Sequence, residues 1–159
     1  AAGVSIYFDC NYRPHLWSSP AEAIEVYRQL YRISDIVFLT TEEAEIVLEG
    51  AAGREIHDVL RNLGAGEIVV KDGERPCTIS TTDQFIEVSA ETVETVVDTT
   101  AAGDSFSAVY LVARTFGCPP EISARFAHKT AAYVVRHKGA VAPLAEMAVT
   151  GNDIGSCRK

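Results

Sequence analysis

The residues of this chain that are best suited to chemistry lie in one short stretch, residues 98–110, which follows a β-branched run at residues 93–97. The pattern predicts a strand that turns through small residues into a helix, and such a turn leaves several backbone N–H groups pointing the same way. Together with the positive end of the helix dipole, those groups would bind an anion such as a phosphate. Asp104 follows the turn, where its carboxylate could act as the general base that deprotonates a hydroxyl for attack on a phosphoryl group.

The same residues have a simpler interpretation as the start of a helix. Asp98 or Thr100 would cap the helix, and Asp104 would only complement the dipole of its first turn. Many helices begin in this way, so spacing alone favours the cap over the catalytic site.

Composition and charge exclude several classes of protein. The 159 residues carry a net charge of −8, which argues against nucleic-acid binding because that needs a basic face. No apolar run reaches the roughly 18 residues of a membrane span, and the N-terminus lacks the basic start of a signal peptide. The chain has no initiating Met and begins within a strand pattern, so we expect it to be truncated.

The four cysteines lie far apart in the sequence and form no C-x-x-C pair. This spacing favours reduced thiols in a cytoplasmic protein over a zinc site or disulfide bonds.

Strand and helix patterns alternate along the chain. We expect strands at residues 3–9, 35–39, 67–71, 77–80, 84–88 and 93–97, of which 77–80 and 84–88 form a hairpin. Alternating strands and helices imply βαβ units on a mostly parallel sheet. We expect one domain over residues 1–148 and a disordered tail over residues 149–159.

Helix starts are marked by capping residues. Ser19 and Pro20 predict one N-cap and first helical position, and Thr40 or Thr41 predicts another N-cap. A third helix is expected at residues 56–63, and a later one near Pro120. The expected apolar face of the first helix consists of Ala23, Ile24, Tyr27, Leu30 and Tyr31, and that of the last of Ile122, Phe126, Ala127, Ala131 and Val134.

The segment from Asp98 to Asp104 resembles the signature Asp-Thr-x-Gly-Ala-Gly-Asp of the ribokinase-like (PfkB) sugar kinases. The resemblance implies a ribokinase-like three-layer α/β/α sandwich with a mostly parallel sheet, with Asp104 as catalytic base and Ala102 and Gly103 in the anion hole. Ala101 stands where the family has its first glycine, which restricts the backbone but keeps the N–H donor.

The loop after the first strand resembles that of the 2-keto-3-deoxygluconate kinases within this family, through the pattern Asp-x-Asn-x-Arg-x-x-Leu-Trp. The resemblance implies that Asn11 and Arg13 face the transferred phosphate and the sugar acid, since an arginine can hold a carboxylate with two hydrogen bonds. The alternative is a surface loop in which Arg13 pairs with Asp9.

Lys71, Asp72 and Gly73 resemble the family's nucleotide loop, so Lys71 and Gly73 are expected to bind nucleotide, as is Gly103. His128 matches a position that borders the adenine in this family. A single histidine on a helix is more often simply packed in the protein.

Two sites for metal ions follow from the resemblance. Glu43, at a helix start, would organise Mg²⁺ through water, although its charge also suits the helix dipole. Residues 137–140 resemble the segment that, together with Asp98 and Thr100, holds a monovalent cation such as K⁺ in relatives.

The resemblance covers only the C-terminal half of a full sugar kinase. It implies an ATP-dependent kinase that phosphorylates 2-keto-3-deoxygluconate or a similar sugar acid on a primary hydroxyl, with ATP, Mg²⁺ and the sugar acid as partners. The alternative is a non-catalytic nucleotide-binding or self-associating fragment. Exposed apolar edges would favour a homo-oligomer, and neither a membrane nor a nucleic acid is an expected partner.

Overall fold

The computed structural model describes residues 3–143, 147, 149 and 151–157. The chain divides into two compact units, one formed by Ala1–Asp72 with Thr78–Ile86 and the other by Gly73–Cys77 with Glu87–Lys159. This division is finer than the expected single domain. We call them unit 1 and unit 2 and describe each by itself.

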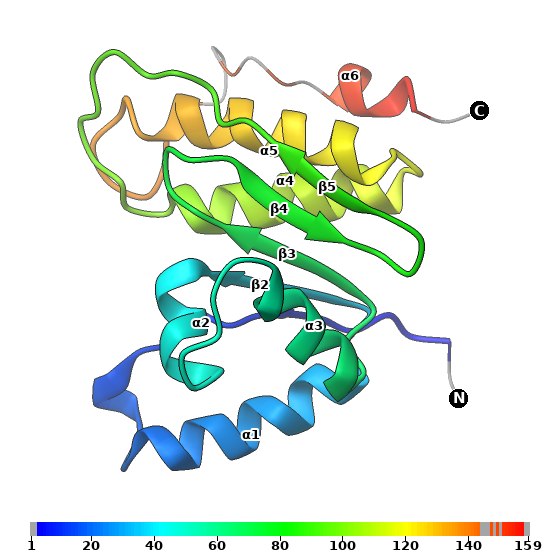
Figure 1. Cartoon of the computed structure of the whole chain (residues 1–159). Helices are drawn as coiled ribbons and strands as arrows, with labels where there is room; N and C mark the ends of the chain where they lie inside the picture. Colours follow the sequence, from blue (N-terminus) through cyan, green and yellow to red (C-terminus); the bar gives the residue numbers. More distant parts are fainter. Residues whose placement is uncertain (1–2, 144–146, 148, 150, 158–159) are drawn as a thin grey trace. The chain divides into compact units, whose positions relative to one another are not determined.

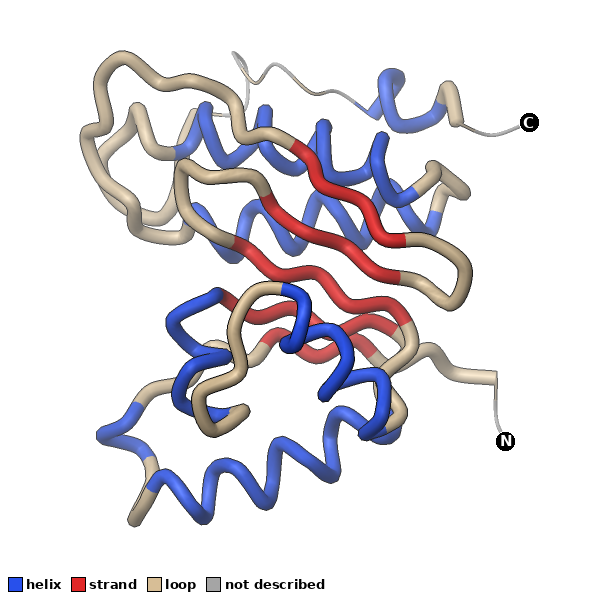
Figure 2. The backbone as a smooth tube through the Cα atoms, in the orientation of Figure 1, coloured by secondary structure: helices blue, strands red, loops and turns tan. Residues whose placement is uncertain are grey.

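One sheet contains five strands in the order β1-β2-β3-β4-β5 (Figure 2). Strands β1, β2 and β3 are parallel and β4 runs antiparallel to β3, so the expected mostly parallel sheet is confirmed. Strands β4 and β5 are neighbours in the sheet, and the Thr81 N–H donates to the Gln84 carbonyl in the short turn between them, as expected for the hairpin. The strand bounds are Tyr7–Asp9, Ile36–Thr40, Glu67–Lys71, Cys77–Ser80 and Phe85–Val88. Strand β1 is shorter than expected, and Val4 and Ile6 before it are exposed.

The helices of unit 1 pack together beside β2 and β3 (Figure 1). They are the 3₁₀ helix η1 (Pro14–Leu16) and the α-helices α1 (Pro20–Ile33), α2 (Thr41–Val47) and α3 (Arg54–Leu63). Helix α1 begins as expected, with Pro20 in the first turn and the Ser19 hydroxyl accepting the Glu22 N–H. Thr40 is the N-cap of α2.

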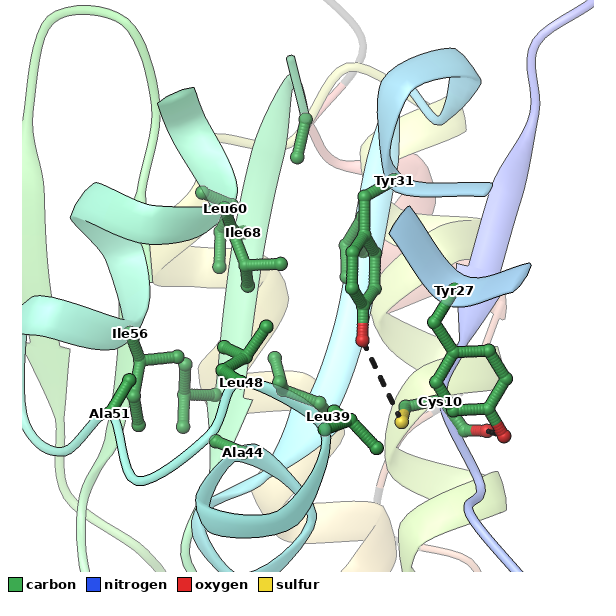
Figure 3. Packing of buried hydrophobic residues seen from close by; sticks show 14 of the residues in the cluster. Cys10, Tyr27, Tyr31, Leu39, Ala44, Leu48, Ala51, Ile56, Leu60 and Ile68 are labelled. Atoms are coloured by element: carbon green, nitrogen blue, oxygen red, sulfur yellow. Dashed lines mark hydrogen bonds between the residues drawn. The ribbon is translucent and has the colours of Figure 1, made fainter. Parts of the chain in front are cut away.

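An apolar core fills the space between these helices and the strands (Figure 3). Tyr31 of α1 and Leu60 of α3 are fully buried, together with Leu39 of β2 and Ile68 of β3. Parallel strands that are covered by helices carry continuous apolar runs, as β2 and β3 do. The expected inward face of α1 is confirmed for Ala23, Tyr27 and Tyr31, while Ile24 and Leu30 are partly buried against the same core.

Unit 2 is built on two helices that pack against each other, α4 (Ala102–Thr115) and α5 (Pro120–Val134). The expected face of α5 is correct at Ala127 and Val134 but wrong at Ile122, which is 36% exposed. Ser123 is fully buried instead, and its hydroxyl donates to the Pro119 carbonyl. A buried serine whose hydroxyl is satisfied locally escapes a search for apolar periodicity.

The strand expected at residues 93–97 is not formed. The N–H groups of Val97 and Asp98 both donate to the Val135 carbonyl beyond the end of α5, at 2.8 and 3.2 Å, and the Val96 and Val97 side chains are more than half exposed. The β-branched run is therefore an extended connection held by a helix end.

The C-terminal segment differs from the expected disordered tail, because Gly151–Gly155 forms the short helix α6. Ile154 of α6 is buried in a small cluster with Ala113 and Cys118. Residues 150, 158 and 159 of the expected tail lie outside the described residues. Among the described helices, none is long and apolar enough to cross a membrane.

The expectation of four reduced thiols is wrong for two of them. Cys118 and Cys157 form a disulfide bond, with their Cα atoms 5.0 Å apart despite a sequence separation of 39. Cys10 and Cys77 are free and buried, and burial raises the pKa of each thiol to about 12. Both therefore stay protonated and unreactive at neutral pH.

His57 of α3 is a buried histidine whose two ring nitrogens both have partners. Nδ1 lies 2.8 Å from the Ser80 hydroxyl and Nε2 lies 2.8 Å from the Thr78 hydroxyl. Burial, and then the nearby Arg61, lower its pKa from 6.5 to about 4. The unfolded chain therefore takes up a proton at higher pH than the folded chain does.

We expect the free energy of unfolding to fall as the pH drops from about 6.5 to about 4, with His57 contributing up to about 3 kcal/mol of that loss. Urea titrations at several pH values should show a flatter pH dependence for His57→Gln. Replacing the exposed His15 by Gln is the matched control and should leave the slope unchanged. Some slope should persist in both variants, because burial also lowers the pKa of His128. An unchanged slope in His57→Gln would contradict this assignment.

Ala101, the residue before α4, has the left-handed backbone angles φ 61° and ψ 11°. Neither Asp98 nor Thr100 caps α4, contrary to that interpretation, because Ala101 is the N-cap and no side chain bonds to the first turn. A Cβ makes this conformation unfavourable by roughly 1–2 kcal/mol.

We expect Ala101→Gly to raise the free energy of unfolding by about 1 kcal/mol, since glycine adopts this conformation without the Cβ clash. The neighbouring Ala102→Gly should lower it by about 0.5 to 1 kcal/mol, because Ala102 lies within the helix. Chemical denaturation of the two variants measures both changes. Equal destabilisation by the two glycines would show that Ala101 is not strained.

Candidate active site

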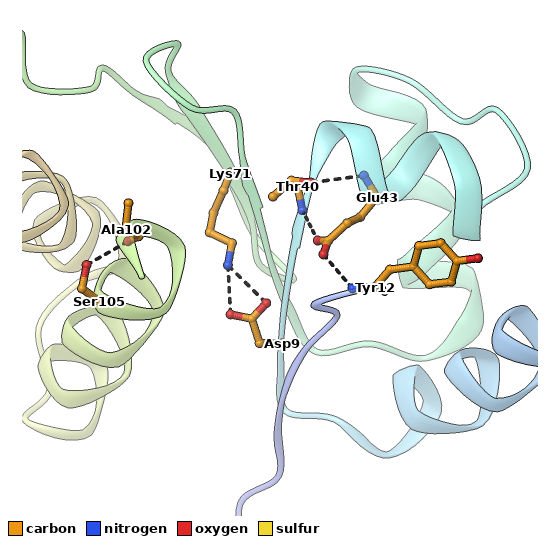
Figure 4. A network of polar contacts seen from close by, with 7 residues as sticks. All are labelled: Asp9, Tyr12, Thr40, Glu43, Lys71, Ala102 and Ser105. Atoms are coloured by element: carbon orange, nitrogen blue, oxygen red, sulfur yellow. Dashed lines mark hydrogen bonds and ion pairs between the residues drawn. The ribbon is translucent and has the colours of Figure 1, made fainter. Parts of the chain in front are cut away.

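In unit 1, the chain segments that follow β1, β2 and β3 all begin at the carboxyl ends of these parallel strands. The register pairs Asp9 of β1 with Phe38 of β2, and Thr40 of β2 with Lys71 of β3. The Lys71 ammonium bonds to both carboxylate oxygens of Asp9, at 3.2 and 2.9 Å (Figure 4). The Lys71 side chain is only 11% exposed. This ion pair joins the ends of β1 and β3, which are separated by β2.

The loop after β1 presents Asn11 and Arg13 to solvent. Asn11 has a positive φ of 41°, a conformation that asparagine tolerates better than most residues. The Arg13 guanidinium donates to the Tyr12 carbonyl at 3.2 Å. The alternative pairing of Arg13 with Asp9 is wrong, because Asp9 is paired with Lys71. The exposed guanidinium retains donors for a carboxylate or phosphate.

Glu43 lies in the first turn of α2, and both of its carboxylate oxygens accept backbone N–H groups. Oε2 accepts the Thr40 N–H at 2.8 Å and Oε1 accepts the Tyr12 N–H at 2.8 Å (Figure 4). The Thr40 hydroxyl accepts the Glu43 N–H in return, which completes a capping box. A carboxylate engaged in this way fits a water-mediated contact to Mg²⁺ better than direct coordination.

Unit 2 contains the turn with the anion-binding pattern. The expected anion hole of Ala102 and Gly103 is corrected at Ala102, because its N–H donates to the Thr99 carbonyl at 3.1 Å and is not free for a ligand. The N–H groups of Gly103 and Asp104 have no hydrogen-bond acceptor within the part of the chain that the structure describes. They lie in the first turn of α4, a helix of 14 residues, where the helix dipole favours an anion. The exposed Asp104 carboxylate is beside them.

Asp98 fixes the turn to the chain that follows α5. Its carboxylate accepts the Thr100 N–H and the Gly139 N–H, each at 2.9 Å. These hydrogen bonds, first those from Thr100, lower the pKa of Asp98. The two segments that were expected to hold a monovalent cation are thus joined, and Asp98 stays ionised. No cluster of three or more candidate metal-binding His, Cys, Asp or Glu side chains occurs among the described residues.

A cavity of about 750 Å³ lies in unit 2, within the range of sites that hold small organic ligands. Gly73, Thr99, Ala102 and His128 are among its lining residues. The structure therefore places one predicted nucleotide-loop residue, the motif turn and the predicted adenine neighbour around a single space. Lys71 belongs to unit 1, where it is paired with Asp9.

His128 is 7% exposed and packs edge to face on Phe106, with ring centroids 5.0 Å apart. Burial lowers its pKa, against a hydrogen bond to the Val88 backbone that raises it. The ring is therefore neutral at pH 7, and its Nε2 is buried without a partner among the described residues. His128 is both a packed histidine and a wall of the cavity.

Several residues of the cavity were missed in the sequence. Ala131 and Ala132 of α5 line it, as do Val93 and Val96 of the connection before the motif. The adjacent alanines are a weak signal, because small side chains on a helix face leave room for a flat ring. Val93 and Val96 were missed because β-branched residues favour a strand, and the sequence analysis therefore placed both in a strand.

These features can perform one kind of chemistry. Two free N–H groups at a helix N-terminus can stabilise a phosphoryl group, and the carboxylate beside them can accept a proton from an attacking hydroxyl. The adjoining cavity is lined mainly by apolar groups, which suits the base of a nucleotide.

Comparison with known proteins identifies relatives of this chain. The 2-dehydro-3-deoxygluconokinase of Escherichia coli is 39% identical over 146 residues, which cover 90% of this chain and 47% of that enzyme. The 2-dehydro-3-deoxygluconokinase of Dickeya dadantii is 38% identical over 150 residues, which cover 92% of this chain and 48% of that enzyme. The chain thus spans about half the length of the curated relatives it matches.

The fold is also similar to that of solved structures. Arabidopsis thaliana ribokinase complexed with ribose and ATP has a TM-score of 0.74 at 27% identity, over 87% of this chain and 44% of that one. The expected ribokinase-like α/β fold is confirmed. The sequence model described as pfkB family carbohydrate kinase matches residues 1–147. This chain belongs to the pfkB family of carbohydrate kinases.

Proposed function

We propose that this chain supplies the nucleotide-binding and phosphoryl-transfer half of an ATP-dependent kinase for 2-keto-3-deoxygluconate or a similar sugar acid. The observation that carries the proposal is the pair of unsatisfied N–H groups of Gly103 and Asp104 at the start of α4. They adjoin Ala102, which lines the 750 Å³ cavity. The names of these two relatives, both 2-dehydro-3-deoxygluconokinases, support the choice of a sugar acid.

In the proposed reaction Asp104 accepts the proton of a primary hydroxyl of the sugar acid. The hydroxyl oxygen then forms a bond to the γ-phosphorus of ATP, and the bond from that phosphorus to the β–γ bridging oxygen breaks, which releases ADP. The N–H groups of Gly103 and Asp104 would stabilise the charge on the transferred group. The left-handed backbone at Ala101 directs the chain into α4, and so it places these donors.

The acceptor side of the reaction is assigned to the loop after β1. Arg13 would hold the carboxylate of the sugar acid with its exposed guanidinium, and Asn11 would hydrogen-bond to the sugar acid or the transferred phosphate. Gly73 and His128 would border the adenine, since both line the cavity of unit 2. Lys71 is also assigned to nucleotide binding, through its positive charge.

Metal ions are assigned to the same regions. Mg²⁺ on the ATP phosphates would neutralise the charge that develops during transfer. Glu43 would contact it through water, because both carboxylate oxygens already accept N–H groups. Asp98 and Thr100 are the proposed neighbours of a K⁺ ion.

Location and assembly belong to this proposal as well. A kinase that uses ATP is expected in the cytoplasm, and the Cys118–Cys157 disulfide is in tension with that reducing compartment. Self-association is proposed through β1, which is the terminal strand in the sheet order and follows the exposed Val4 and Ile6.

We expect the chain to transfer phosphate from MgATP to 2-keto-3-deoxygluconate, and Asp104→Asn to lower that rate by about 10²- to 10⁴-fold, the usual contribution of a general base. Nucleotide affinity should stay equal or increase, because a negative charge beside the phosphates is removed. The measurement is sugar-acid phosphate formed over time, with calorimetric titration of MgADP into the same samples.

Nucleotide binding by the unaltered chain without any transfer would favour the alternative, a non-catalytic nucleotide-binding module. Transfer that survives Asp104→Asn would exclude Asp104 as the base.

A further inference from the structure

The loop after β1 is held at both peptide units that flank Asn11. The Cys10 carbonyl belongs to the peptide before Asn11 and accepts the Tyr27 hydroxyl at 3.1 Å. The Tyr12 N–H belongs to the peptide after Asn11 and donates to Glu43 at 2.8 Å. Since a residue's φ and ψ set the planes of its two flanking peptides, these two bonds together determine the backbone of Asn11.

The backbone of Asn11 needs such support. Its φ of 41° lies in the left-handed region, which costs an L-residue free energy relative to the ordinary regions. Strained conformations persist only where the surrounding structure fixes them, and they cluster at functional sites. The Tyr27 side of the support is buried in the core, with Tyr27 5% exposed. The Glu43 side depends on a single carboxylate.

That carboxylate joins two strand ends. One oxygen accepts the N–H of Tyr12, three residues beyond the end of β1, and the other accepts the N–H of Thr40, the last residue of β2. Hydrogen bonds to an ionised acceptor are shorter and stronger than those between neutral groups. The side chain of Tyr12 is itself buried, 6% exposed, and meets Tyr27 edge to face. The Tyr12 N–H therefore has a fixed position to which the carboxylate is matched.

We propose that Glu43 is a positioning residue for the loop from Asp9 to Arg13. It fixes the peptide between Asn11 and Tyr12, and so it sets the direction in which Asn11 and Arg13 leave the loop. The proposal rests on the proposed function only for what these two side chains bind. In this account, Glu43 acts on the sugar acid through the loop, and its carboxylate is a bridge between backbone groups rather than a direct metal ligand.

The test is amide hydrogen exchange of the full chain, followed residue by residue by NMR. Glu43→Gln keeps the size of the side chain but puts an NH₂ group opposite one of the two N–H donors. We expect the Tyr12 amide to exchange about tenfold faster or more in this variant, as for the loss of a hydrogen bond to a charged group. Unchanged exchange at Tyr12 would overturn the proposal.

The matched control is Thr40→Ala, which removes the side-chain cap of α2 but keeps both backbone donors and the carboxylate. It should leave Tyr12 exchange within about twofold of the original. If Thr40→Ala accelerated exchange at Tyr12 as much as Glu43→Gln does, the protection would come from the start of α2 in general, and the proposal would fail.

A second measurement needs no variant, so it stands even if Glu43→Gln does not fold. In the unaltered chain, the amide shifts of Tyr12 and Thr40 should titrate with pH together with the Glu43 carboxyl carbon. Independent titration of Tyr12 would show that the carboxylate is not its acceptor. Adding MgCl₂ alone should leave these three signals in place, and a joint shift on adding it would instead identify direct metal binding.

The hydrogen-exchange and titration experiments use neither nucleotide nor sugar acid. A chain that fails to transfer phosphate but shows the expected exchange and titration would lose the proposed function and keep the role of Glu43.

Discussion

The parallel register of β1, β2 and β3 is the constraint on which the arrangement of unit 1 depends. It sets the ends of β1, β2 and β3 beside one another, and the residues there then bond across the strands. The Asp9–Lys71 ion pair spans the middle strand, and Glu43 joins the chain beyond β1 to the end of β2. Because side chains alternate along a strand, a slip of one residue would turn Asp9 or Lys71 to the other face and break their ion pair.

Unit 2 depends on a different constraint, the need of backbone N–H groups at a helix start for an acceptor. The Ala102 N–H finds one at Thr99, whereas the two that follow have none among the described residues. Ala101 accepts a strained conformation at this turn, and the Asp98 carboxylate holds the turn to Gly139. The structure thus keeps donors unsatisfied at the position where the family's signature places a phosphate.

Short sequence patterns predicted the structure correctly where it depends on interactions between residues close together in the chain. The strand at residues 67–71 and the N-caps Ser19 and Thr40 are as expected, because apolar runs and capping hydroxyls act within a few residues. Non-local partners were not predictable. The extended run at residues 93–97 is held by the distant Val135 carbonyl, and the second hydrogen bond of Glu43 reaches 31 residues back to Tyr12. The sequence predicted an N-cap at Thr40 or Thr41, but nothing in it indicated that the Glu43 carboxylate also bonds to another loop.

The central claim is that the start of α4 binds the phosphates of a nucleotide and the adjoining cavity binds its base. Calorimetric titration of MgADP into the chain tests it most directly, alongside Gly103→Asp, which adds a negative charge at the free N–H groups. Ala108→Asp adds the same charge further along α4, at an exposed position, and serves as the control. We predict saturable binding that is lost in Gly103→Asp and kept in Ala108→Asp. No binding by a folded, unaltered chain, or equal affinity in all three, would contradict the account.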